Sequence, residues 1–400
     1  MGARCSDCIR SRPKQVLFAD VKRQLKERTM IRRVLITGGA GFIGSHLARE
    51  LVRSGYTVRV LDNFSAQVHG KSSRIPDQFE NIEVIEGDVR TRAHLKHALR
   101  DVDAVYHLAA SVGVGQSMYE VHSYVENNTL GTANLLQLLI ENPVERLVVA
   151  SSMSLYGEGL YKSADGRVHF ETRRPLERLK KKEWEPLGAE GESLSALPTP
   201  ESKRPDLASI YALSKYDQEM MCLLMGRTYR IPTVALRFFN VYGTGQSLSN
   251  PYTGVMAIFA SRLLNGKTPS IFEDGKQMRD FVHVSDVVQA CRLALEGPQA
   301  VDHAFNIGSG EQITIQEVAL RMAEAMGKPH LVPEITGQYR VGDIRHCFAD
   351  ISLARTLLGY RPRVSMESGM RELIEWLAGQ RAVDRTQEAR EELAVKGLAV

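Results

Sequence analysis

Five apolar runs recur along the first 150 residues, at 33–37, 57–61, 83–87, 103–108 and 146–150. Most are apolar nearly throughout rather than at alternate positions, which is typical of parallel strands buried on both faces. Segments with helical character separate them, and helices are predicted over 45–54 and from about 119 to 140. Strands that alternate with helices predict an α/β fold with a doubly wound parallel sheet.

Residues 157–206 interrupt this alternation. They are rich in Lys, Arg, Glu, Pro and Ser and contain the basic run Lys180-Lys181-Lys182. This composition predicts a surface insertion that is largely loop, with a substrate lid or a partner contact as the alternative. The alternation resumes with a helix around Tyr211 and a strand at 233–238.

The second half of the chain has shorter and less regular elements. Helices are predicted near 254–265, 285–296 and 314–326, which indicates a smaller α/β C-terminal lobe over 241–380 that caps the sheet domain at 31–240. Residues 381–400 are predicted to form a charged, frayed, helix-prone tail, and residues 1–30 a mobile N-terminal extension.

Composition narrows the class of protein. The chain has 400 residues, 43% hydrophobic and 24% charged, as in ordinary globular proteins, and its net charge of +4 gives no reason to expect a nucleic-acid partner. No apolar run approaches the roughly 18 residues needed to cross a bilayer, so no membrane association is expected. Five scattered cysteines do not form a disulfide framework, so we expect a cytoplasmic protein. No metal is expected, because the pair Cys5 and Cys8 has no second pair at zinc-finger spacing.

A glycine-rich turn provides the strongest chemical signal. Gly39-x-Gly41-x-x-Gly44 follows the first predicted strand and opens the first predicted helix. Glycines in this context allow a pyrophosphate to approach the backbone at the helix N-terminus. Asp62, at the end of the next strand, would bind ribose hydroxyls and repel a 2′-phosphate, and no basic residue follows it directly. The motif therefore predicts a Rossmann-type domain that binds NAD rather than NADP.

The carboxyl ends of later strands carry three further candidates. Asp88, after the third strand, could accept a hydrogen bond from the adenine amino group, or it could cap the helix that follows. Tyr211 and Lys215 stand four residues apart, so they share one helix face, and an ammonium near a phenol lowers its pKa. With Ser152 at the end of the fifth strand, they form a candidate acid/base group that exchanges a proton with a hydroxyl or carbonyl.

These motifs occur together in one known family. The segments 38–44, Leu108-Ala109-Ala110, 128–132, 152–157 and Tyr211-x-x-x-Lys215 resemble the extended short-chain dehydrogenase/reductases, which act on nucleotide sugars. The resemblance runs from about residue 32 to 376. It implies a homodimer formed through a four-helix contact that includes the tyrosine helix. It also implies that NAD contacts Gly38, Gly41, Phe42, Ile43, Gly44, Asp62, Asn63, Asp88, Val89, Leu108, Ala109, Ala110, Asn128 and Lys215.

The same resemblance assigns catalytic and substrate-binding roles. Ser152 matches the catalytic Ser/Thr, Tyr211 the proton-transfer tyrosine, and Lys215 the lysine that holds the nicotinamide ribose. Asn240 matches a diphosphate-contacting asparagine, and Arg279 and Arg340 match arginines that grip the diphosphate and nucleoside. Cys347 occupies a position that gates the sugar pocket in UDP-hexose 4-epimerases, and the alternative is a buried packing cysteine.

The residues after Ser152 narrow the reaction. Dehydratases of the family carry an Asp-Glu pair there, whereas this chain has Met153 and Ser154, so the acid and base for elimination are missing. The expected reaction is inversion at C4 of a nucleotide sugar. Segments 209–218, 233–243 and 246–255 are most similar to epimerases that act on a dTDP-linked 6-deoxyhexose, dTDP-L-rhamnose. Paired cysteines associated with the insertion of those enzymes are absent here. A UDP-hexose 4-epimerase, a net 4-ketosugar reductase and a non-catalytic relative are the alternatives.

Overall fold

The computed structural model describes residues 31–70, 79–170, 172, 174–340 and 342–398. The predicted extension at 1–30, with Cys5 and Cys8, lies outside this part of the chain. Within it, no helix combines the length and apolar composition needed to cross a bilayer. Nor does a cluster of potential metal ligands occur among the described residues.

A seven-stranded parallel sheet forms the centre of the molecule, in the order β14-β9-β5-β4-β1-β2-β3. Its strands are β1 (Arg33–Thr37), β2 (Thr57–Asp62), β3 (Glu83–Glu86), β4 (Ala104–His107), β5 (Arg146–Ser152), β9 (Thr233–Phe238) and β14 (Ala304–Ile307). Every residue of β4, β5 and β9 is buried, as their continuous apolar runs require. The predicted doubly wound α/β fold is confirmed.

Helices cover both faces of this sheet and produce two separate apolar cores. One core contains residues of α2 (Phe42–Arg53) and α11 (Val284–Glu296). The other contains residues of α4 (Arg92–Ala98), α7 (Gly131–Glu141) and α9 (Ile210–Tyr229). The predicted long helix near 119–140 is confirmed as three consecutive segments: α6 (Val121–Tyr124), a π-helical segment (Val125–Leu130) and α7. Short helices α3 (Ala66–His69) and α5 (Val114–Ser117) follow β2 and β4.

The C-terminal lobe has its own apolar core, to which α10 (Val255–Leu264), α12 (Ile315–Ala325) and α13 (Met366–Leu377) contribute. Three small sheets surround it, β10-β13, β11-β16 and β15-β12-β17. Their strands are β10 (Asn240–Tyr242), β11 (Ser270–Ile271), β12 (Met278–Arg279), β13 (Phe281–His283), β15 (Ile313–Thr314), β16 (Glu334–Ile335) and β17 (His346–Cys347). Since β14 and α11 return to the central sheet, the lobe and the sheet domain are interleaved beyond residue 240.

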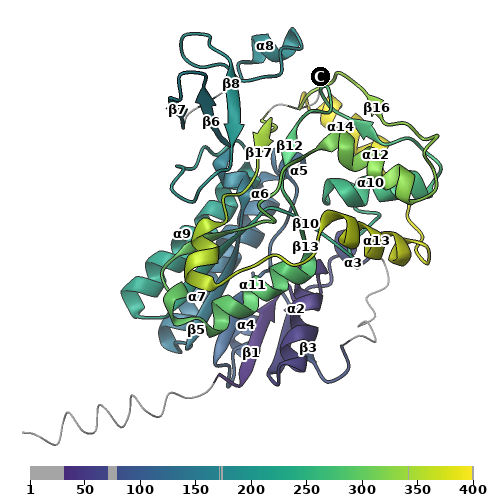
Figure 1. Cartoon of the computed structure of the whole chain (residues 1–400). Helices are drawn as coiled ribbons and strands as arrows, with labels where there is room; N and C mark the ends of the chain where they lie inside the picture. Colours follow the sequence, from purple (N-terminus) through teal and green to yellow (C-terminus); the bar gives the residue numbers. More distant parts are fainter. Residues whose placement is uncertain (1–30, 71–78, 171, 173, 341, 399–400) are drawn as a thin grey trace, which may run out of the picture.

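The insertion at 157–206 is more ordered than its composition indicated. β6 (Leu160–Ser163), β7 (Val168–His169) and β8 (Leu194–Leu197) form an antiparallel sheet, and α8 (Leu176–Lys180) lies between β7 and β8 in the chain. Figure 1 shows these elements together at one end of the molecule. These elements are short, so most of the insertion is loop, as predicted, but contacts with distant residues hold it in place.

Ion pairs of two buried arginines connect the insertion with the C-terminal lobe. Arg174 of the insertion contacts Glu158 at 2.9 Å and Glu273 of the C-terminal lobe at 2.6 Å. Arg345, whose side chain is fully buried, contacts Glu273 at 3.0 Å and Glu185 of the insertion at 2.5 Å. The insertion and the lobe therefore share one ionic core.

The predicted frayed tail is also corrected. Its residues form α14 (Thr386–Val395), which buries Ala389 and Leu393. Asp384, just before α14, lies 3.0 Å from Lys267 and 3.5 Å from Arg262, at the end of α10. The segment is thus docked onto the C-terminal lobe beside α12 (Figure 1).

Candidate active site

A cavity of about 750 Å³ runs from the carboxyl ends of the central strands to the C-terminal lobe. It brings together the predicted site residues from both halves of the chain. Those that line it are Gly38, Gly41, Phe42, Ile43, Gly44, Asp62, Asn63, Asp88, Val89, Leu108, Ala109, Ala110, Ser152, Tyr211, Lys215, Asn240, Arg279 and Arg340. Two predicted contacts, Asn128 and Cys347, are not among the lining residues.

The glycine turn at one end of the cavity is shaped to bring backbone close to a ligand. Gly38 has φ of +68°, and a Cβ there would lie 2.8 Å from the Ala109 backbone. A Cβ on Gly44 would lie 2.5 Å from the Gly38 carbonyl oxygen. The N-cap of α2 is Gly41, which offers no side-chain cap, so the first amide groups of the helix remain available to a pyrophosphate. These residues fit NAD.

Asp62 is held rigidly where the adenosine ribose is expected. Its carboxylate accepts hydrogen bonds from the backbone amides of Ala40, at 3.0 Å, and Phe64, at 2.9 Å. The first of these links it directly to the glycine turn. An acid fixed at this point favours free ribose hydroxyls over a 2′-phosphate.

Asp88 lines the same end of the cavity. Burial raises its pKa, but hydrogen bonds from Arg90 and Asn63 outweigh this and lower the pKa to about 2. The N-cap of α4 is Thr91, so the alternative reading of Asp88 as the helix cap is wrong. The adenine contact stays a prediction.

Ser152 and Tyr211 meet in the middle of the cavity. The Ser152 hydroxyl oxygen accepts hydrogen bonds from the amide of Ser154, at 3.2 Å, and from its hydroxyl, at 2.9 Å. With its oxygen occupied as an acceptor, Ser152 directs its own proton toward Tyr211. Burial raises the pKa of Tyr211 above its ordinary value, and the hydrogen bond with Ser152 offsets this only in part. Ser154 is thus a positioning residue. The sequence singled out this position only because dehydratases of the family carry an acidic residue there.

Lys215 does not act on Tyr211 as the sequence suggested. Its ammonium donates to the Gln218 amide oxygen at 2.6 Å, and burial lowers the pKa of Lys215 to about 8. In this structure it is Ser152, and not Lys215, whose contact lowers the pKa of Tyr211. Lys215 nevertheless lines the cavity, and its contact with the nicotinamide ribose stays a prediction.

A buried polar network that the motifs did not reveal holds Gln218. The Gln218 amide nitrogen lies 2.9 Å from the Thr132 hydroxyl and 3.2 Å from His107. His107 also contacts Thr37 at 2.8 Å, and burial, with the nearby Lys215 charge, lowers the pKa of His107 to about 3. A neutral histidine adds no like charge beside the ammonium. The spacing of Gln218, three residues after Lys215, was the signal available in the sequence.

Asn128 supports the site from behind. Its side-chain oxygen accepts from the Ser111 amide at 2.7 Å, and its nitrogen donates to Ser214 of α9 at 2.9 Å. It is fully buried and ties the loop after β4 to the tyrosine helix. These hydrogen bonds give Asn128 a structural role, and its predicted contact with NAD stays a prediction.

Two of the predicted substrate residues, Arg279 and Arg340, meet at one carboxylate at the other end of the cavity. Arg340 donates two hydrogen bonds to Asp343, at 3.1 and 2.8 Å, and Arg279 lies 3.8 Å from the same residue. Arg279 also donates to the backbone carbonyls of Ile344 and Arg345. The Asn240 amide oxygen is buried without a partner among the described residues. The contacts of all three with substrate stay predictions.

Cys347 lies in the core instead of on the cavity wall. It is 1% exposed, and its sulfur lies 3.9 Å from the Thr199 hydroxyl. This burial favours the packing alternative, and the gating role stays a prediction.

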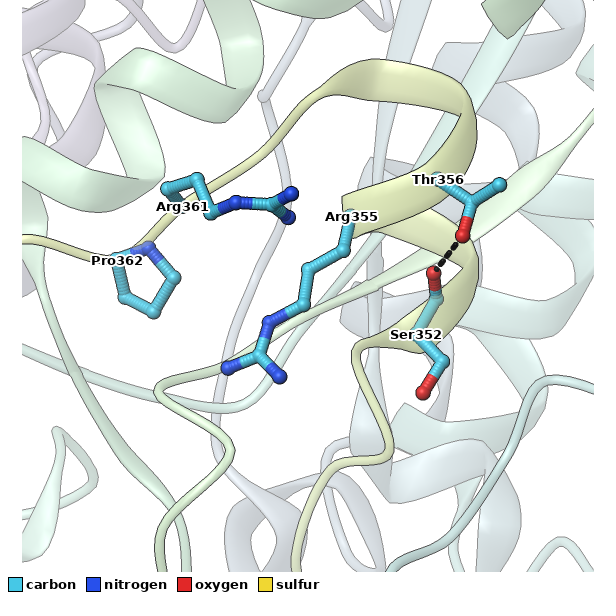
Figure 2. A pocket seen from close by; sticks show the side chains of 5 residues that line it. All are labelled: Ser352, Arg355, Thr356, Arg361 and Pro362. Carbon is cyan, nitrogen blue, oxygen red and sulfur yellow. Dashed lines mark hydrogen bonds between the residues drawn. The ribbon is translucent and has the colours of Figure 1, made fainter.

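A second hollow, of about 470 Å³, lies apart from these motifs and is lined by Ser352, Arg355, Thr356, Arg361 and Pro362. Figure 2 shows the side chains of Arg355 and Arg361 reaching toward the same space. Both arginines are exposed, and no predicted site residue lines this hollow, so it is separate from the candidate active site.

Comparison with known proteins agrees with this arrangement. The model of the NAD dependent epimerase/dehydratase family matches residues 34–180 and 188–308. The chain belongs to this family. The predictions of the family, of an NAD-dependent epimerase and of NAD as cofactor are confirmed.

Members of the family with similar sequences and structures differ in substrate. A dTDP-L-rhamnose 4-epimerase of Burkholderia thailandensis is 33% identical over 87% of this chain and 95% of its own. The crystal structure of a UDP-glucose 4-epimerase from Thermotoga maritima with UDP-glucose has a TM-score of 0.71 and 30% identity, covering 86% of this chain and 98% of that chain. A Thermus thermophilus UDP-glucose 4-epimerase in complex with NAD has a TM-score of 0.69 and 32% identity, over 87% and 99%.

Proposed function

We propose that the protein is a nucleotide-sugar 4-epimerase that inverts C4 of a dTDP-linked 6-deoxyhexose, dTDP-L-rhamnose, with NAD held throughout. The observation that carries the proposal is the single cavity that joins the glycine turn, the Ser152–Tyr211 pair and the arginines around Asp343. Met153 and Ser154 supply no acid or base for dehydration. The identity shared with the Burkholderia enzyme supports the choice of sugar.

The residues that line the cavity have different roles in the proposed inversion at C4. Bound beside the glycine turn, NAD would supply the acceptor, and then the donor, of the C4 hydride. Tyr211, as phenolate, takes the proton of the 4-hydroxyl and later gives it back, and Ser152 orients that oxygen. Arg279 and Arg340 hold the diphosphate, so the 4-keto sugar can turn about this anchor and present its other face. Because the diphosphate stays anchored, each face of C4 can in turn be placed against Tyr211, Ser152 and the nicotinamide.

A UDP-hexose 4-epimerase is the second candidate, because a structure 30% identical to this chain holds UDP-glucose. A panel of dTDP-, UDP- and GDP-sugars, incubated without added cofactor and followed by NMR at C4, tests both candidates. We expect inversion of dTDP-L-rhamnose. Inversion of UDP-hexoses alone would select the second candidate, and failure with every dTDP- and UDP-sugar would reject both. Stoichiometric consumption of added cofactor would instead indicate a net 4-ketosugar reductase.

We further propose that the protein is a homodimer that pairs through α9. Three apolar side chains of this helix are exposed at helical spacing, Leu213 (41%), Met220 (39%) and Leu224 (55%). Exposed apolar side chains also occur in α6, at Val121, and in the π-helical segment, at Val125 and Leu130.

Light scattering is expected to give twice the monomer mass for the native chain and a smaller mass for Leu224→Glu. A matched change at Val332, which is 62% exposed in the C-terminal lobe, should leave the mass unchanged. A native monomer would reject the proposal.

A further inference from the structure

The docked C-terminal helix α14 forms part of the cavity wall. Thr386, Ala389, Arg390 and Leu393 line the cavity at the end where Arg279 and Arg340 lie. The family model ends at residue 308, well before this helix. The wall therefore includes a segment for which the family motifs give no role.

Contacts with both halves of the molecule hold α14 over the cavity. Leu393 packs against α5, which follows β4, since its Cδ2 atom lies 3.0 Å from where a Cβ on Gly115 would stand. On the lobe side, Tyr252 donates a hydrogen bond of 2.6 Å to Glu392. Helix α14 thus contacts both the sheet domain and the C-terminal lobe, between which a substrate would lie.

Arg390 presents a guanidinium on the inner side of this helix. It donates to the Ser270 hydroxyl at 2.7 Å and to the Gln338 amide oxygen at 2.5 Å, both uncharged partners. Its guanidinium carbon lies 5.7 Å from the centre of the Phe272 ring, and that of Arg340 lies 4.8 Å from the same ring. Arg390 and Arg340 therefore both lie against the Phe272 ring on the cavity wall.

The charges at this end of the cavity do not balance. The lining residues of the C-terminal lobe and α14 include three cations, Arg279, Arg340 and Arg390, but one carboxylate, that of Asp343, which pairs with the first two. Arg390 takes part in none of the ion pairs found within the described residues. Two positive charges are thus left in excess, which matches the two negative charges of a diphosphate ester. Guanidinium groups are well suited to phosphate oxygens, because their planar fork donates two hydrogen bonds at once.

We propose that Arg390 of α14 is a further substrate-binding residue, which donates to phosphate oxygens of the nucleoside diphosphate beside Arg279 and Arg340. This inference rests on the proposed function for the identity of the anion. It makes α14 a part of the substrate site, with Ser270 and Gln338 orienting the guanidinium.

The test compares the purified full-length variants Arg390→Gln and Arg385→Gln by calorimetric titration with dTDP and with thymidine. Arg385 precedes the same helix, is exposed and loses the same charge. We expect Arg390→Gln to weaken dTDP binding about tenfold or more, as for loss of a charge-assisted hydrogen bond, and to leave thymidine binding unchanged. With a nucleotide sugar, its KM should rise while kcat stays near the native value. Thermal unfolding curves establish that each variant is folded.

Two results would overturn the inference: unchanged affinity of Arg390→Gln for dTDP, or an equal loss in Arg385→Gln. An equal loss for dTDP and thymidine would also reject a phosphate contact. The titration does not depend on turnover. If the native chain inverted no sugar but Arg390→Gln still lost dTDP affinity, the proposed function would fail and the anion site would stand. If sugars were inverted and Arg390→Gln bound dTDP normally, only this inference would fail.

Discussion

Replacing Tyr211 by phenylalanine is expected to lower kcat by about 10²–10⁴-fold, the usual contribution of a positioned acid/base group. The change removes one oxygen atom from a ring that packs against Tyr124 with centroids 6.4 Å apart, so the surrounding structure should persist. NAD should remain bound, because the glycine turn and Asp62 are untouched. Turnover of the preferred sugar by NMR, together with the NAD content of the purified protein, measures both parts of this expectation.

Tyr216 provides a matched control on the same helix. It is partly buried against the core and does not line the cavity, so Tyr216→Phe should leave kcat near the native value. If Tyr211→Phe turned over every accepted nucleotide sugar at the native rate, Tyr211 could not be the proton-transfer group. The arrangement of Ser152 and Ser154 would then have to serve a different reacting oxygen.

Replacing Arg345 by methionine is expected to lower the free energy of unfolding by about 3–5 kcal/mol, the usual cost of removing one partner from a buried ion pair. The Arg345 side chain is 0% exposed and contacts Glu273 and Asp274, at 3.0 and 2.6 Å, as well as Glu185. Methionine fills much of the volume but leaves Glu273, which is 2% exposed, with one cation fewer. Urea titration monitored by circular dichroism measures the loss.

The control for this change is a surface arginine that also has an acidic partner. Arg371 is 68% exposed and lies 3.1 Å from Glu367, a pair expected to contribute about 0–1 kcal/mol. Arg371→Met should therefore have little effect on unfolding. Equal small effects at both positions would show that the ionic core does not stabilise the fold.

The central sheet and its cofactor end could be predicted because their signals are local. Strands buried on both faces need continuous apolar runs, and the turn after β1 needs glycine where a Cβ would meet the backbone. Both requirements are visible within a few residues of sequence. The same holds for Asp62, which closes β2 beside that turn.

The packing of the insertion and the docking of α14 could not be predicted in this way, because distant partners decide where these segments lie. Arg345 and Glu185 are 160 positions apart, and Tyr252 and Glu392 are 140 apart. A segment whose charged residues form buried ion pairs can have the same amino-acid composition as a solvated, charged loop. Only the fold distinguishes the two cases.

The catalytic helix illustrates an intermediate case. The spacing of Tyr211 and Lys215 correctly placed both on the cavity wall. It did not determine the direction of the lysine side chain, because Gln218 on the next turn also lies within reach of the ammonium and holds it at 2.6 Å. Helical spacing fixes which residues are neighbours, and side-chain hydrogen bonds then select among them.

The sharing of Asp343 by two arginines has a practical consequence for work in solution. One carboxylate 2.8 Å from Arg340 and 3.8 Å from Arg279 neutralises only part of their charge, and guanidinium groups bind oxyanions well. If these arginines hold the substrate diphosphate as proposed, phosphate and sulfate will compete with the substrate and raise its apparent KM. Kinetic assays and crystallisation trials for this protein therefore belong in buffers that contain neither ion.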